Sequence, residues 1–214
     1  MIANVPRECG RNIQPTMEMN KTLAIFLAAA SLVATLPVRA SESGDKVFAD
    51  FSLWSPSLQA AEPSDSVRAF RLALYGRNAD VKGVDISVVG VTDGDFVGAQ
   101  WNGIGIIKGN AYGLIGALYS GLAYVGGDVN GVSAAFVNIG MKDLNGAEIG
   151  IWNQVGAEMT GLQLGIVNYA AALNGVQLGL VNVATGGYGL QVGIVNYFKG
   201  SDVFDVLPLV NFNF

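Results

Sequence analysis

The 214-residue chain is acidic, with 17 acidic against 12 basic side chains, and it contains no histidine. The absence of histidine removes the commonest general base and metal ligand. An acidic balance without a basic stripe argues against nucleic acid as a partner. The length suffices for one domain with a sizeable core.

Residues 1–40 are predicted to be an upstream segment followed by a cleaved signal peptide. Lys21 precedes an apolar run over residues 22–36, and Pro37-Val38-Arg39-Ala40 follows it. This order is typical of a secretory signal, and the run is short for a membrane span; a buried core helix is the alternative. We therefore expect export with cleavage after Ala40. The expected location is the outer membrane or cell surface, or alternatively the periplasm.

Residues 41–68 are predicted to form an N-terminal capping segment and a loop. The large aromatic residues Phe48, Phe51 and Trp54 are three apart, so they do not alternate as a strand face would. The stretch AAEPSDS that follows is turn-like.

A repeat of 14 to 15 residues occupies residues 69–202 and is almost identical three times over residues 161–198. Its clearest units read GLQLGIVNYAAALN, GVQLGLVNVATGGY and GLQVGIVNYF, and they contain no charged residue. A period this regular indicates one structural unit built repeatedly. Residues 203–214 are predicted to be a C-terminal strand. The earlier units begin at Ala69, Gly83, Gly98, Gly113, Gly131 and Gly146.

Each unit has the pattern of a β-strand. Numbered from its opening residue, a unit has apolar residues at the even places, a polar residue at place 3 and a small residue at place 5. Alternation of this kind indicates a strand with one buried face, which the apolar even places would supply. Segments such as TDGD and KGSD have turn chemistry. The sequence therefore predicts an all-β protein.

Two all-β architectures fit this repeat. In a parallel β-solenoid, identical places stack and the Asn and Gln rows become hydrogen-bonded ladders. The likeness of all units favours this fold, because strands in an antiparallel sheet alternate direction. The alternative is an antiparallel outer-membrane β-barrel. The C-terminal Phe214, the 14-residue spacing and the uncharged stretch favour the barrel. We expect the solenoid.

Two rows of the repeat are candidate functional residues. A flat glutamine face could dock a polymer or a sheet-like partner, or it could only satisfy the stack. A neighbouring apolar row of valines is typical of a contact surface. The candidate interaction ladder comprises Gln163, Gln177, Gln191, Val167, Val181 and Val195. The structural repeat positions are Asn168, Asn182, Asn196, Gly165, Gly179 and Gly193.

The units GLQLGIVN, GVQLGLVN and GLQVGIVN resemble the bacterial surface-repeat family first noted in spirochaete surface lipoproteins. The resemblance covers about 150 residues and extends to SVRAFRLALYGRNADVKGVDISVV and PLVNFNF. It implies an envelope or surface location and supplies no catalytic or binding residues. The chain departs from the family because its only cysteine, Cys9, precedes the predicted signal, which leaves no cysteine for a lipid anchor.

No motif in the chain indicates an enzyme. The densest acidic group is Asp80, Asp85, Asp93 and Asp95, which could bind calcium or act as an acid only if its oxygens converged; plain turns are the favoured interpretation. The serine and threonine hydroxyls have no base to activate them. We expect no catalytic residue, cofactor or metal.

The expected function is that of a non-enzymatic envelope or surface repeat protein with a structural, adhesive or interaction role. A small pore or structural barrel in the outer membrane is the alternative. The expected partner is an unidentified envelope protein or polymer, with membrane association and with self-association left open.

Overall fold

A computed structural model describes residues 44–214, apart from the side chains of residues 117–119. The predicted signal peptide and its cleavage after Ala40 lie outside the described residues. The strands are β1 (Lys46–Trp54), β2 (Leu58–Gln59), β3 (Ser66–Asn78), β4 (Val81–Thr92), β5 (Phe96–Ile107), β6 (Ala111–Val125), β7 (Val129–Gly140), β8 (Leu144–Leu178), β9 (Val181–Ala184), β10 (Gly187–Phe198) and β11 (Val206–Asn213).

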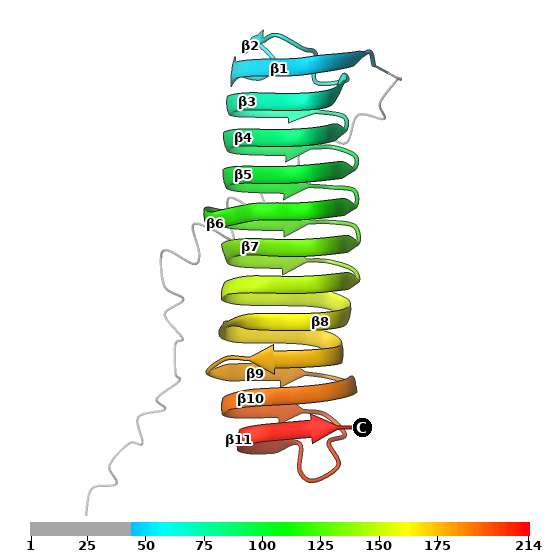
Figure 1. Ribbon diagram of the computed structural model, residues 1–214, viewed down its shortest axis with the longest axis vertical. Helices are drawn as coiled ribbons and strands as arrows, with labels where there is room; N and C mark the ends of the chain where they lie inside the picture. Colours follow the sequence, from blue (N-terminus) through cyan, green and yellow to red (C-terminus); the bar gives the residue numbers. More distant parts are fainter. Residues whose placement is uncertain (1–43) are drawn as a thin grey trace, which may run out of the picture. The chain divides into compact units, whose positions relative to one another are not determined.

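All these strands belong to one 11-stranded sheet that winds into a parallel β-solenoid. Its order runs from β11 through β10 and β9 down to β3, β1 and β2. Strands β1 and β3 to β10 pair in parallel, whereas β2 and β11 pair antiparallel at the two ends. Figure 1 shows the coils stacked one above another, with the turns between strands on the right and the strands bending around the left edge.

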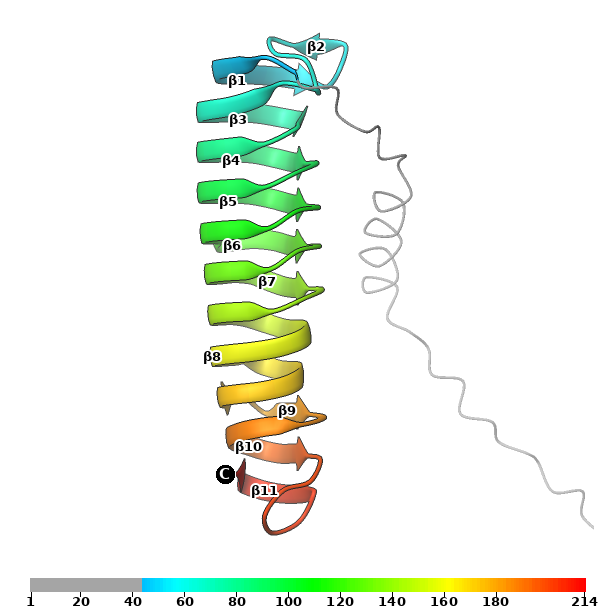
Figure 2. The ribbon, with the colours of Figure 1, turned by 90° about the vertical axis from the view of Figure 1, so that its right-hand side faces the viewer.

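The structure confirms the predicted solenoid and overturns the barrel. The two ends of the sheet, β2 and β11, do not pair with each other, so the sheet stays open. Figure 2 shows the same open stack from the side. The physical reason is that each repeat unit makes one full coil and returns to the edge where it began. Consecutive units therefore run in the same direction, whereas neighbouring strands of a barrel would have to run in opposite directions.

The register confirms the unit boundaries that the sequence predicts. Gly83, Gly98, Gly113, Gly131 and Gly146 pair in sequence along the stack. Their φ angles lie between 121° and 142°, a region that L side chains rarely adopt. A Cβ atom at any of these glycines would also collide with backbone of the preceding coil. The glycine column is therefore required by both conformation and space.

Within the segment predicted as an N-terminal cap and loop, β1 is a strand paired in parallel with β3. Phe48, Phe51 and Trp54 are all exposed on it. Register shifts between Val47 and Ala49, and between Ser52 and Trp54, change the side to which successive residues point. Residues three apart in β1 can therefore point to the same face of the strand.

The largest correction concerns which face of the repeat is buried. Leu164 and Ile166, at even places, are 43% and 46% exposed, whereas Gln163 at place 3 is fully buried. Likewise, Ile86 at an even place is exposed, whereas Asp85 at place 3 is buried. Places 6 and 7 both point outward, which marks the corner around which each strand bends. The prediction that the apolar even places form the core is therefore wrong.

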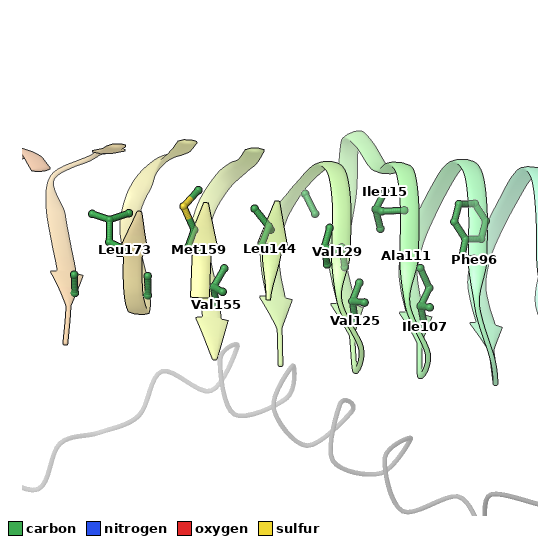
Figure 3. Close-up of a cluster of buried hydrophobic side chains, with 14 of the residues drawn as sticks. Phe96, Ile107, Ala111, Ile115, Val125, Val129, Leu144, Val155, Met159 and Leu173 are labelled. Atoms are coloured by element: carbon green, nitrogen blue, oxygen red, sulfur yellow. The ribbon is translucent and has the colours of Figure 1, made fainter. Parts of the chain in front are cut away.

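An apolar core does exist, but it lies near the turns. One row comes from the residue two places before each glycine of the column, and a facing row comes from place 10. Figure 3 shows the two rows across the interior. The first row is Val67, Val81, Phe96, Ala111, Val129, Leu144, Met159 and Leu173, and the second is Ile107, Val125, Val155, Ala170, Ala184 and Phe198.

Candidate functional site

The glutamine row lies inside the solenoid, so it is not a docking face. The side chains of Gln163, Gln177 and Gln191 are all fully buried. The Nε2 of Gln191 donates to Oε1 of Gln177, and that of Gln177 donates to Oε1 of Gln163, both at 2.7 Å. Each Nε2 also donates to a backbone carbonyl in its own coil. The alternative interpretation, that these residues satisfy the stack, is what the geometry supports.

A second ladder of asparagines runs beside the first, in the opposite direction. Except in Asn196, the last member, each Nδ2 donates to the Oδ1 of the asparagine one coil nearer the C-terminus, at 2.8 Å. Each Nδ2 also donates to a backbone carbonyl at 2.9 to 3.2 Å. Because the glutamine ladder donates toward the N-terminus, the amide dipoles of the two ladders oppose one another. The ladder consists of Asn138, Asn153, Asn168, Asn182 and Asn196.

The glycines at place 5 make room for this asparagine ladder. A Cβ atom at Gly165 would lie 2.6 Å from Nδ2 of Asn153, and one at Gly179 would lie 2.6 Å from Nδ2 of Asn168. Place 5 is Ala135 in the coil that follows Ala123, because the alanine at place 8 leaves room for a methyl group. Glycine first appears at place 5 in the next coil, which follows Asn138, the first asparagine of the ladder.

In the N-terminal coils that open at Gly83 and Gly98, the polar residue stands at place 5 and the glycine at place 8, the reverse of the C-terminal coils. Ser87 and Asn102 occupy place 5 and pair in register, while Gly90 occupies place 8. A Cβ atom at Gly90 would lie 2.5 Å from Oγ of Ser87. The register irregularity between Ile115 and Ser120 in β6 separates the two arrangements. In both arrangements, a polar side chain at place 5 or place 8 is accompanied by glycine or alanine at the other place.

A buried ion pair anchors the N-terminal end of the polar interior. Arg71 donates from Nε and Nη2 to the two carboxylate oxygens of Asp85, at 2.8 and 2.7 Å. Gln100 and Asn102 also donate to this carboxylate. Burial alone would raise the pKa of Asp85, but these hydrogen bonds and the Arg71 charge hold it below its ordinary value. The Asp85 carboxylate thus links neighbouring coils.

Glu148 ends the glutamine ladder as its final acceptor. Nε2 of Gln163 donates to its Oε2 at 2.9 Å. Its side chain is almost fully buried, and its hydrogen-bond partner Gln163 is not a basic residue. Burial raises the pKa of Glu148 to about 8, and the hydrogen bond from Gln163 offsets only part of that rise. The carboxyl group is therefore mainly neutral at pH 7.

The other predicted acidic residues do not converge on a common point. Asp93 pairs with Arg77 at 2.7 Å and with Lys108 at 2.8 Å. Oδ1 of Asp80 accepts the backbone N–H of Asp95 at 2.9 Å, in the turns between coils. No group of three potential metal ligands occurs within residues 44–214.

Outward side chains form an apolar surface, which we define as places 2, 4, 6 and 7 of the coils between residues 81 and 198, leaving out residues 116–121 and the buried Leu122 and Ala134. No charged residue occupies any of these places. Val195 is 45% exposed on this surface, and it pairs with the half-buried Val181, which pairs with Val167. The structure thus places the valine row outside and the glutamine row inside. Other exposed members are Val84, Ile86, Val88, Trp101, Leu114, Phe136, Ile151, Trp152, Leu164, Ile166, Leu180, Val192 and Ile194.

The fold and the ladders define the class: this is a β-solenoid repeat protein with asparagine ladders. Comparisons with protein families, with characterised proteins and with solved structures give no match. The described residues include no helix long and apolar enough to cross a membrane.

Gly165→Ala is expected to destabilise the protein by roughly 1–3 kcal/mol, because the added methyl group would displace the Asn153 amide. Urea unfolding followed by circular dichroism measures this. Gly186→Ala is the control, since the nearest atom to its Cβ would be 3.8 Å away. Equal stability of the two variants would contradict the space requirement.

Glu148→Gln is expected to remove a pH dependence of stability. The folded pKa of about 8 exceeds the ordinary value of 4.5, so the folded state retains its proton over that interval. Stability of the parent protein should therefore fall as the pH rises from about 4.5 through about 8. Above pH 8 the variant should be more stable, by on the order of a few kcal/mol.

Urea midpoints measured from pH 4 to pH 9 test this prediction. Glu158→Gln is the control, because Glu158 is exposed at a turn. A Glu148→Gln variant with the same pH profile as the parent would show that Glu148 does not titrate in the interior.

Proposed function

We propose that this chain is a non-enzymatic structural repeat protein of the cell envelope that acts through the apolar surface of its solenoid. The observation that carries the proposal is the uncharged, outward-facing surface that continues over the coils from β4 to β10. Exposed apolar surface of this extent is typical of proteins that bind a partner. The predicted export signal and the resemblance to surface-repeat proteins support an envelope location.

Several features of the interior favour a structural role over catalysis. Many of the buried polar groups pair with one another within the stack, as Arg71 and Asp85 do, and as Gln163 and Glu148 do. A shallow depression on the apolar surface, between Phe136 and Leu164, is lined without any titratable side chain. Such a lining can hold an apolar group and offers no acid, base or nucleophile.

Rigidity fits this role as well. Each coil is held to its neighbours by a parallel backbone ladder and by stacked amides, so the outward side chains keep a fixed spacing. Parallel strands repeat about every 4.8 Å along the stack. A surface of this kind suits adhesion or assembly, because a large partner can contact many coils at once.

The proposal predicts that the protein fractionates with the cell envelope and depends on the apolar surface to remain there. The test is to express the chain and a double variant, Leu164→Asp with Ile166→Asp, in the source organism, and to wash isolated envelopes with urea and carbonate. The parent should remain with the envelope, and the double variant should be released into the wash.

Met141→Asp is the matched control, since Met141 is apolar and 48% exposed but lies at a turn, outside the apolar surface. It should be retained like the parent. Recovery of the parent in the cytoplasm or the medium, or equal retention of the double variant, would contradict the proposed function.

A further inference from the structure

We propose that the apolar surface is covered by a lipid bilayer. The solenoid would lie along the membrane, with the corner of its coils in the hydrocarbon and its turns in water. This inference rests on the proposed function and names the partner of the same surface. Three independent features of the described residues point to lipid.

The first feature is the segregation of charge across the coil. Between residues 81 and 198, the charged side chains occupy either the interior or the edge that carries the turns. Asp85 and Glu148 are the interior ones. A charge in the hydrocarbon region is costly, and charges at the water side are not. The charged residues at or beside the turns are Lys82, Asp93, Asp95, Lys108, Asp128, Lys142, Asp143 and Glu158.

The second feature is the position of five tyrosines, which flank the apolar surface on both layers, next to the turns. On the first layer, Tyr112 and Tyr188 immediately precede the glycine column and are 40% and 66% exposed. On the second layer, Tyr124, Tyr169 and Tyr197 occupy place 9, two residues beyond the corner, and are half-buried.

Tyrosine is enriched where membranes meet water, because its ring is apolar and its hydroxyl group needs a polar partner. In the coils around Gly113, Gly161 and Gly189, tyrosines thus lie between the turns and the aliphatic corner. This order matches the depth profile of a bilayer leaflet. Contact with a second copy of the chain would require an apolar patch but not tyrosines at both margins.

The third feature is the backbone. In the parallel coils, N–H and C=O groups bond to the coils above and below, along the axis of the stack. Along both layers, the outward surface therefore presents side chains over paired backbone, and the register is irregular between Ile115 and Ser120. Hydrocarbon cannot hydrogen-bond to a backbone, so it admits only structures whose backbone is satisfied internally. The regular parts of the two layers meet that condition.

The test uses the full chain purified from envelopes and vesicles of phosphatidylcholine, a lipid without net charge that suits an acidic protein. The chain should float with the vesicles in a density gradient. Trp101 and Trp152 lie on the apolar surface, so lipids brominated on their acyl chains should quench the fluorescence of the parent. The double variant Leu164→Asp with Ile166→Asp should lose at least about tenfold in vesicle binding, whereas Met141→Asp should bind like the parent.

Four outcomes would overturn the inference. The parent could fail to float while remaining monomeric, or its tryptophans could be insensitive to the brominated lipids. It could instead form a dimer that shields the tryptophans from an aqueous quencher and does not float, which would assign the surface to a second copy. Envelope retention without vesicle binding would assign it to a protein or polymer partner; that result removes lipid as the partner and leaves the proposed function intact.

Discussion

The structure depends on one constraint: a buried amide needs partners, and here an identical amide one coil away supplies them. Asn168 donates to Asn182 and accepts from Asn153, so each member is satisfied only inside the ladder. A buried polar group without a partner would cost about 1–3 kcal/mol. This requirement fixes the parallel direction and the register of the stack together, and it requires glycine at place 5 beside each asparagine.

The same constraint explains why the apolar residues lie outside. Near the corner, places 3, 5 and 8 of the two layers converge, and the amide ladders fill the space between them. The even places of the same strand must then point outward. Apolar packing is left to the region near the turns, where Phe96, Met159 and Phe198 lie. With the polar places turned inward, places 2, 4, 6 and 7 form the outer surface, and none of them carries a charge between residues 81 and 198.

The sequence predicts the period, the unit boundaries, the strand character and the parallel stacking, because identical residues at identical places specify identical environments. It does not predict which face is buried, since an alternating pattern is unchanged when the two faces are exchanged. One signal was present: glycine at place 5 appears only after asparagine at place 8, which indicates that both point to the same crowded side. Arg71 and Asp85 stand at place 3 of consecutive units, so their adjacency follows from the predicted stacking, whereas their burial and the neutral state of Glu148 depend on which face is inside.

The central claim is that Gln163 points inward and Leu164, its neighbour in the chain, points outward. Residues 44–214 contain no cysteine, so single cysteines at these two positions can be compared with the small, uncharged reagent N-ethylmaleimide. The account predicts rapid modification of Leu164→Cys in the folded protein, and modification of Gln163→Cys only after unfolding in urea. Faster modification at position 163 than at position 164 would contradict it and return the apolar face to the core.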